Sequence, residues 1–223
     1  GNAVRTFTMP AGAAVPVLTV NAPNVTVNTS GSGSITFQQP VTWQSTAGVT
    51  NGAVSCTFNS TVTVNTNVTQ GSGDLVYNSS YTQSGGTFTP SAGVLDYNSA
   101  FTLAGGVFNA PSGVVSFASD FTISGGTFNA GSGTVVFDGG ASTVNVATTQ
   151  SFNNLTFNTP GAYKVVDSSD VLVVNGTLTL TDGQVLNGTV NALGNVLLAS
   201  TFDGGSATLL ISGNAVRTFT MPA

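Results

Sequence analysis

Apolar positions recur along the middle of this chain with a period of twenty residues. Residues 81–100, 101–120 and 121–140 align without a gap, and the second half of 61–80 keeps the same register. Four columns of this alignment are apolar: Tyr81, Phe101 and Phe121; Val68, Phe88, Phe108 and Phe128; Tyr77, Tyr97, Phe117 and Phe137; and Leu75, Leu95, Val115 and Val135. Between the turns apolar and polar residues alternate, and no window has a helical i, i+3, i+4, i+7 stripe. The pattern predicts short strands and essentially no helix.

Glycine marks the ends of these predicted strands. One column holds Gly73, Gly93, Gly113 and Gly133, and Gly-Gly pairs recur at 85–86, 105–106 and 125–126. Glycine at a fixed corner allows a positive φ or a close approach of two backbones. A β-sandwich does not need equivalent residues at fixed columns, whereas a solenoid does, because each coil buries its apolar face only against a similar coil. We therefore predict an all-β fold, a parallel β-solenoid (β-helix) with coils of about 20 residues.

A second repeat operates at a much larger scale. Residues 1–11 and 213–223 both read GNAVRTFTMPA, at an offset of 212 residues. Matched edge strands would explain this identity, but the ends of repeat arrays are usually atypical in sequence. We expect 1–223 to be a single continuous solenoid segment, in which 1–212 is one long repeat unit and 213–223 is the start of the next. About ten coils at ~4.8 Å each would give a rod of roughly 50 Å per unit.

The second half of the chain, residues 141–212, is less regular. Its coils are longer or interrupted, most clearly at 158–164, a segment that contains Pro160, Gly161 and the only lysine, Lys164. Because Pro and Gly concentrate in surface connections, we expect this segment to protrude from the rod as a loop.

Charge is scarce throughout the chain. All eight acidic residues are Asp, the three basic residues are Arg5, Lys164 and Arg217, and there is no His. Three cations cannot neutralise a row of phosphates, so we expect no nucleic-acid partner. The lack of His removes the commonest general base and metal ligand. No apolar run approaches the ~20 residues of a membrane-spanning helix, and the single cysteine, Cys56, is expected to be a small buried residue.

Asp167 and Asp170 form the closest pair of carboxylates. Paired carboxylates hydrolyse glycosidic bonds in many enzymes. The alternative is that both residues cap backbone amides in the turn Asp167-Ser168-Ser169-Asp170. With no His and so few cations to assist, we expect no enzymatic activity and no catalytic residues.

Two further patterns suggest binding chemistry. Asp138-Gly139-Gly140 and Asp203-Gly204-Gly205 resemble corners of calcium-binding solenoids, but such sites need an Asp in coil after coil. We therefore expect no metal and no cofactor. A column of threonines could order water as ice-binding proteins do, although stacked threonines also suit ordinary strands. It contains Thr42, Thr82, Thr102 and Thr122, with Val62 interrupting.

Three stretches together resemble a known class of proteins. They are GSGTVVFDG at 131–139, SFNNLTFN at 151–158 and VNGTLTL at 174–180. Their succession resembles the β-strand-repeat segments of very large bacterial surface proteins, which are similar to the rods of filamentous-haemagglutinin-like and autotransporter adhesins. The resemblance covers nearly the whole chain and implies a stalk or fibre with no catalytic residues to carry over.

The sequence thus predicts a structural repeat of an exported extracellular filament or cell-surface stalk that serves attachment or cell contact. Its expected partners are further copies of the same repeat, end to end. A glycan- or surface-binding adhesin module is the alternative, and a carbohydrate-active enzyme or an ice-binding solenoid is less favoured. An exposed aromatic patch beside 158–170 would favour glycan binding, and clustered carboxylates in a groove would favour catalysis.

Overall fold

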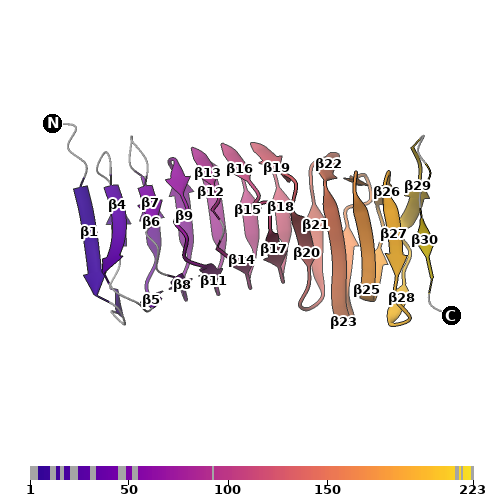
Figure 1. Cartoon of the computed structure of the whole chain (residues 1–223), viewed down its shortest axis with the longest axis horizontal. Coiled ribbons are helices and arrows are strands. Elements are labelled where there is room, and N and C mark those ends of the chain that lie inside the picture. Colours follow the sequence, from indigo (N-terminus) through magenta and orange to yellow (C-terminus); the bar gives the residue numbers. More distant parts are fainter. Residues whose placement is uncertain are drawn as a thin grey trace.

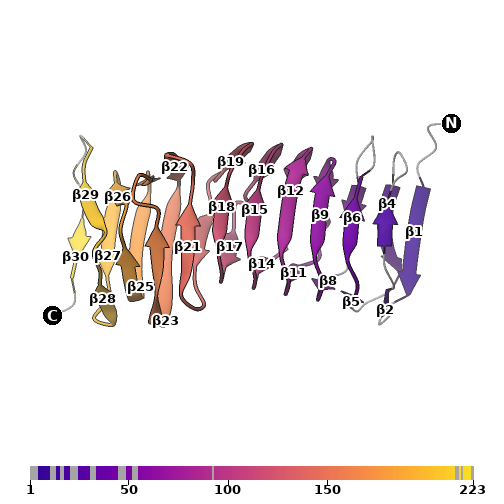
Figure 2. The same cartoon turned by 180° about the vertical axis from the view of Figure 1, so that it is seen from behind.

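The computed structural model is a rod of stacked β-coils with the two ends of the chain at opposite ends of the rod (Figures 1 and 2). Every regular element in the described ranges is a strand, and no helix there is long and apolar enough to cross a membrane. Side chains are described from residue 34 onward, except at 49–51. The structure describes residues 5–10, 14–15, 18–20, 25–30, 34–44, 49–51, 55–91, 93–213, 216 and 218–221.

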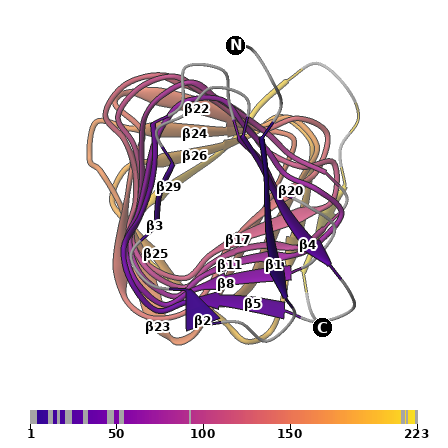
Figure 3. The same cartoon turned by 90° about the vertical axis from the view of Figure 1, so that its left-hand side faces the viewer.

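Each coil of the N-terminal half has three faces, which enclose the core in the view along the rod (Figure 3). The first face stacks β2 (Ala14–Val15), β5 (Ser34–Phe37), β8 (Ser55–Phe58), β11 (Leu75–Tyr77), β14 (Leu95–Tyr97), β17 (Val114–Phe117) and β20 (Thr134–Phe137). The second stacks β3 (Leu18–Val20), β6 (Val41–Trp43), β9 (Val62–Asn65), β12 (Tyr81–Gly85), β15 (Phe101–Leu103), β18 (Phe121–Ile123) and β21 (Ser142–Asn145). The third stacks β1 (Arg5–Pro10), β4 (Val25–Ser30), β7 (Val49–Asn51), β10 (Val68–Thr69), β13 (Thr87–Thr89), β16 (Val107–Asn109) and β19 (Thr127–Asn129). These pairings are parallel, so the predicted parallel β-solenoid is confirmed.

The same three faces continue through the less regular C-terminal half. The long strands β23 (Asn154–Val166) and β25 (Thr177–Leu186) each serve two faces, since the two halves of β23 pair with β20 and β21. The first face then continues to β27 (Asn195–Leu198) and β30 (Phe219–Thr220), and the second to β28 (Phe202–Gly204). The third face continues as β22 (Thr149–Phe152), β24 (Val171–Val174), β26 (Thr189–Ala192) and β29 (Thr208–Ile211).

The core is built from the predicted apolar columns. Tyr81 stacks on Phe101 with ring centroids 5.4 Å apart, and Phe101 stacks on Phe121 at 5.3 Å. The Leu75 and Tyr77 columns lie on the same inward face, because alternate residues of a strand point to the same side. Identical spacing in successive coils therefore turns each sequence column into a continuous buried ladder.

Glycine is required where successive coils turn the same corner. Gly106 has a φ of +76°, and a Cβ there would collide with the backbone of Gly85 and Gly86 in the preceding coil. Left-handed backbone and close coil-to-coil approach thus coincide at Gly106. A Cβ at Gly105 would lie 2.5 Å from the carbonyl oxygen of Ser84, so both positions of the recurring pair require glycine.

The threonine column differs from its expected alignment. Thr63, and not Val62, pairs with both Thr42 and Thr82. The interval from Thr42 to Thr63 is one position longer than the regular period and that from Thr63 to Thr82 is one position shorter, so a strict period misplaces this one coil. Val62 instead pairs with Val41 and Tyr81 in the adjoining buried column. The threonine ladder is therefore uninterrupted from β6 to β18.

The segment 158–164, expected to protrude as a loop, lies within β23, and only its middle leaves the ladder. Asn158 pairs with Asp182 and Tyr163 pairs with Gln184, so the residues between them form a bulge opposite a single residue of β25. Pro160 and Gly161 in the bulge are exposed, whereas Lys164 is fully buried. The inward–outward alternation is interrupted at 160–163 and resumes at Lys164, which shares the inward side of the strand with Val166, two positions away.

Candidate functional site at the C-terminal end of the rod

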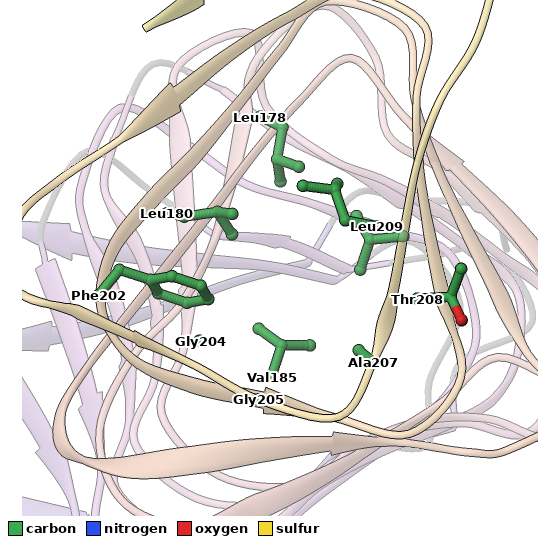
Figure 4. A pocket seen from close by; sticks show the side chains of 10 residues that line it. Leu178, Leu180, Val185, Phe202, Gly204, Gly205, Ala207, Thr208 and Leu209 are labelled. Atoms are coloured by element: carbon green, nitrogen blue, oxygen red, sulfur yellow. The ribbon is translucent and has the colours of Figure 1, made fainter. Parts of the chain in front are cut away.

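An apolar hollow of about 220 Å³ lies at the C-terminal end of the described coils. Leu178, Leu180 and Val185 of β25 point into it, and Phe202 and Leu209 from the last coil line its rim (Figure 4). Val190, Gly204, Gly205, Ala207 and Thr208 complete the lining. The hollow is the continuation of the solenoid core, because Leu178 and Leu180 belong to the same inward columns as Leu155 and Phe157.

The last strand of the third face exposes the apolar residues that a further coil would cover. Leu209 and Ile211 of β29 are 40% and 48% exposed, whereas Val190 and Ala192, their register partners one coil earlier, are buried. Within the described residues β28 pairs only with β25 and β29 only with β26. Both strands therefore present one unpaired backbone edge, which is a template for another strand.

On the first face the next coil has already begun. Phe219 of β30 is in register with Val196 of β27, the backbone N–H of Val196 donates to the carbonyl of Thr218 (2.9 Å), and the N–H of Thr218 donates to Oδ1 of Asn195 (3.1 Å). This strand belongs to the second copy of GNAVRTFTMPA, of which Arg217 lies outside the described residues. The two copies lie on different faces, because Arg5–Pro10 forms β1 on the third face and pairs with β4.

The two carboxylates at 167 and 170 cap backbone amides, which was one of the two interpretations of their spacing. Asp170 is buried, its Oδ2 accepts from the N–H of Val146 (2.6 Å) and its Oδ1 accepts from the N–H of Thr148 (2.7 Å). Oδ1 of Asp167 accepts from the N–H and hydroxyl of Ser169 at 3.1 and 3.0 Å. Both oxygens of Asp170 are thus engaged in a turn.

The buried Lys164 lies within the electrostatic influence of the half-buried Asp138, an arrangement that the sequence did not indicate. Nζ of Lys164 donates to the carbonyls of Ala118 (3.2 Å) and Gly140 (3.0 Å) and to Oγ of Ser142 (2.5 Å). Burial lowers the pKa of Lys164 to about 8, although the charges of Asp138 and Asp120 oppose this shift. Burial and the charge of Asp96 raise the pKa of Asp138, whose Oδ1 has no hydrogen-bond partner in the described structure. The sequence signal that could have predicted the burial of Lys164 is its position two residues before the apolar Val166, on the same side of a strand.

Polar ladders run along the outside of the rod, parallel to its axis. Nδ2 of Asn78 donates to Oδ1 of Asn59 (2.8 Å), and Nδ2 of Asn98 donates to Oδ1 of Asn78 (3.0 Å). The threonine ladder occupies strands such as β15 and β18, in which only the central residue faces outward, so it is one residue wide. These ladders pair coil with coil and satisfy polar side chains without charge.

The residues considered for metal binding are separate in space. No group of three or more His, Cys, Asp or Glu side chains in the described part of the chain is arranged to hold a metal ion. Asp203 lies in β28 at the exposed end of the rod. Cys56 is buried on the first face, and burial raises the pKa of its thiol to about 11.

Comparison with known proteins gives no relative. No protein-family model matches the chain, no curated protein matches its sequence, and no solved structure matches its fold.

Proposed function

We propose that this chain is a structural repeat of an exported extracellular filament or cell-surface stalk that serves attachment or cell contact. The observation that carries the proposal is the coincidence of two features at one end of the rod. The apolar core is open there, and the chain there repeats the eleven residues with which it begins. A further copy of the same unit, end to end, would cover the apolar residues and pair the free strand edges.

The surface chemistry suits a long rod outside the cell. Only 5% of the residues are charged, and uncharged Asn and Thr ladders hydrogen-bond or stack along the axis. Cohesion along the axis therefore depends little on ionic strength, since salt screens exposed charges but not buried apolar ladders. A rod of this kind holds an attachment site at a distance from a surface without needing a site of its own.

Immunogold electron microscopy of the producing cells tests this function. Antibodies raised against the folded 223-residue chain are expected to label filaments or stalks outside the cell, at many points along each filament. Label confined to the cell interior, or to single particles, would refute the proposal. Preincubation of the antibody with the purified chain is the control for specificity.

Glycan binding by the rod itself is the second candidate, and one groove favours it. Tyr163 is 41% exposed and lines a shallow groove with Asp120, Ser142 and Thr143. The exposed ring of Tyr163 offers an apolar face on which a sugar ring can stack. Beside it, Oδ1 of Asp120 accepts from the N–H and hydroxyl of Thr143, and Oγ of Ser142 accepts from Lys164. Binding to a glycan array that is lost in Tyr163→Ala and kept in Val114→Ala, a change at another exposed apolar residue, would support it. No binding by the unmodified chain would leave the rod as a spacer.

A further inference from the structure

We infer that each 212-residue unit advances the solenoid by a whole number of turns plus one face, so that successive units are rotated by a third of a turn. This inference rests on the proposed function, because it describes how one unit follows another in the filament. Its starting point is that one sequence, GNAVRTFTMPA, lies on the third face at β1 and on the first face at β30.

The rotation follows from the number of residues that one coil needs to return to the same face. On the third face, one coil extends from Val25 to its partner Val49, and a shorter one extends from Val171 to its partner Thr189. Phe219 follows Leu209 of β29 by only about half of either interval. The second copy of the eleven-residue sequence therefore cannot lie directly above β29, on the face that the first copy occupies.

The register on the first face fits a normal coil. The interval from Val196 to its partner Phe219 equals the interval from Leu18 to its partner Val41 on the second face. Phe7, which is equivalent to Phe219, pairs with Val27 in the coil that follows it. The phenylalanine is thus in register with a valine both in the coil before it and in the coil after it, as a strand inside a continuous stack would be.

The same reasoning assigns the occupant of the apolar hollow. With β1 of the next unit on β27, the next unit's Ala14 and Val15 follow above β28, and its Leu18, Thr19 and Val20 follow above β29. The interval from Leu209 to Leu18 of the next unit would equal the observed interval from Ile35 to its partner Cys56. The first coil of the next unit then covers the hollow, with its Thr19 beside Leu210.

The rotation has a consequence for what the filament displays. Any feature that occurs once per unit, such as the groove at Tyr163, winds around the rod and returns to the same side at every third unit. With a rise of roughly 50 Å per unit from about ten coils at ~4.8 Å, the orientation repeats at roughly 150 Å.

Disulfide trapping in a two-unit chain, residues 1–212 followed by 1–223, tests the inference. Adjacent strands lie ~4.8 Å apart, within the range of about 4.4–6.8 Å between Cα atoms that a disulfide spans. One variant combines Leu210→Cys in the first unit with Thr19→Cys in the second. The matched variant combines Leu210→Cys with Thr8→Cys in the second unit, which would be neighbours if the units stacked without rotation. Single-cysteine variants control for reaction with Cys56, which is buried.

The rotated arrangement predicts that the Thr19 pair oxidises nearly completely and that the Thr8 pair stays reduced. The reverse result would overturn the rotation and leave the filament intact, and comparable oxidation of both pairs would also overturn it. Oxidation of neither pair would overturn both the rotation and end-to-end stacking. In the 223-residue chain, Leu197→Cys with Thr220→Cys tests the position of β30, since these residues pair directly. Failure of that pair to oxidise in a folded chain, checked by circular dichroism, would also refute the inference.

Discussion

Phe108 and Phe128 are one period apart in the sequence and stack in neighbouring coils, with ring centroids 5.3 Å apart and planes within 6° of parallel. Phe88 stacks on the other side of Phe108 at 4.8 Å. Phe108 is therefore buried by its own equivalents above and below. The stability of a coil depends on its two neighbours in the way expected for solenoids, where interfaces between repeats supply much of the folding energy.

Phe108→Ala is expected to lower the free energy of unfolding by about 3–5 kcal/mol, the usual cost of removing a buried phenylalanine. The loss includes a cavity, because Phe88 and Phe128 are held in place by their own strands. Val114→Ala, at a side chain that is 54% exposed, is the matched control and should change stability by no more than about 0.5 kcal/mol. Urea denaturation followed by circular dichroism measures both. Equal effects of the two variants would contradict the buried ladder.

Two glycines of the repeating corners should respond differently to alanine. Gly106→Ala places a Cβ against the backbone of the preceding coil at a φ of +76°, so we expect a loss of at least about 2 kcal/mol. A Cβ added at Gly113 would meet no heavy atom within 4 Å. Gly113→Ala should leave stability unchanged or raise it by about 0.4–1 kcal/mol, because alanine restricts the unfolded chain. Thermal unfolding distinguishes the two, and a tolerant Gly106 would show that the coils do not approach closely at this corner.

Tyr97 and Tyr81 are a matched pair of buried tyrosines. The Tyr97 hydroxyl has no hydrogen-bond partner in the described structure, whereas that of Tyr81 is 3.1 Å from Oε1 of Gln83. Because an unsatisfied buried hydroxyl is costly, Tyr97→Phe should raise the free energy of unfolding by about 1 kcal/mol, and Tyr81→Phe should lower it by a similar amount. Chemical denaturation at pH 7 measures both changes. Two losses of equal size would show that Tyr97 has a partner.

The same tyrosines predict a loss of stability in alkali. Burial raises the pKa of Tyr97 well above its ordinary value and does the same for Tyr77 and Tyr81. Above about pH 10 the unfolded chain loses these protons while the folded chain keeps them, so the free energy of unfolding falls as pH rises. Tyr97→Phe should make this decline shallower between about pH 10 and about 11.5. An unchanged slope would mean that Tyr97 ionises freely in the folded protein.

Asp170→Ala is expected to cost about 3 kcal/mol, because it leaves the amides of Val146 and Thr148 without their charged acceptor. The turn it supports is strained, with φ of 55° at Ala147 and 122° at Thr148. Asp167→Ala removes only the two local, exposed bonds from the N–H and hydroxyl of Ser169 and should cost less than about 1 kcal/mol. Thermal unfolding compares the variants. A large loss of stability in Asp167→Ala with none in Asp170→Ala would show that Asp167, and not Asp170, is the important cap.

The sequence was sufficient to predict the parallel solenoid because the fold repeats its side chains in register. Phe88, Phe108 and Phe128 form one physical ladder, so their column could be identified without coordinates. The same period failed at Thr63, where a coil one position longer than the period is followed by a coil one position shorter. A corner can gain a residue without disturbing the strands on either side. The apolar column shifts with it, since Val62 pairs with Val41 and Tyr81, so aligning this column in place of a strict period would have located the longer and the shorter coil.

The polar interior was harder to predict, because local composition and strand alternation disagree there. Pro160 and Gly161 indicate a loop and lie in an exposed bulge of β23, yet Lys164 just beyond the bulge points inward and donates to carbonyls of the two preceding coils. For the C-terminal end of the rod, the sequence shows only that the eleven residues of 1–11 recur at 213–223. The face on which the second copy lies, and hence the rotation between units, depends on the summed lengths of the intervening coils. The sequence alignment does not give these lengths in the irregular C-terminal half.

Small-angle X-ray scattering of the 223-residue chain and the two-unit chain tests the central claim, that the solenoid continues from one unit into the next. The account predicts an unchanged cross-section and an increase in length of roughly 50 Å, from about ten added coils at ~4.8 Å each. A wider particle, or two rods joined at a variable angle, would contradict it.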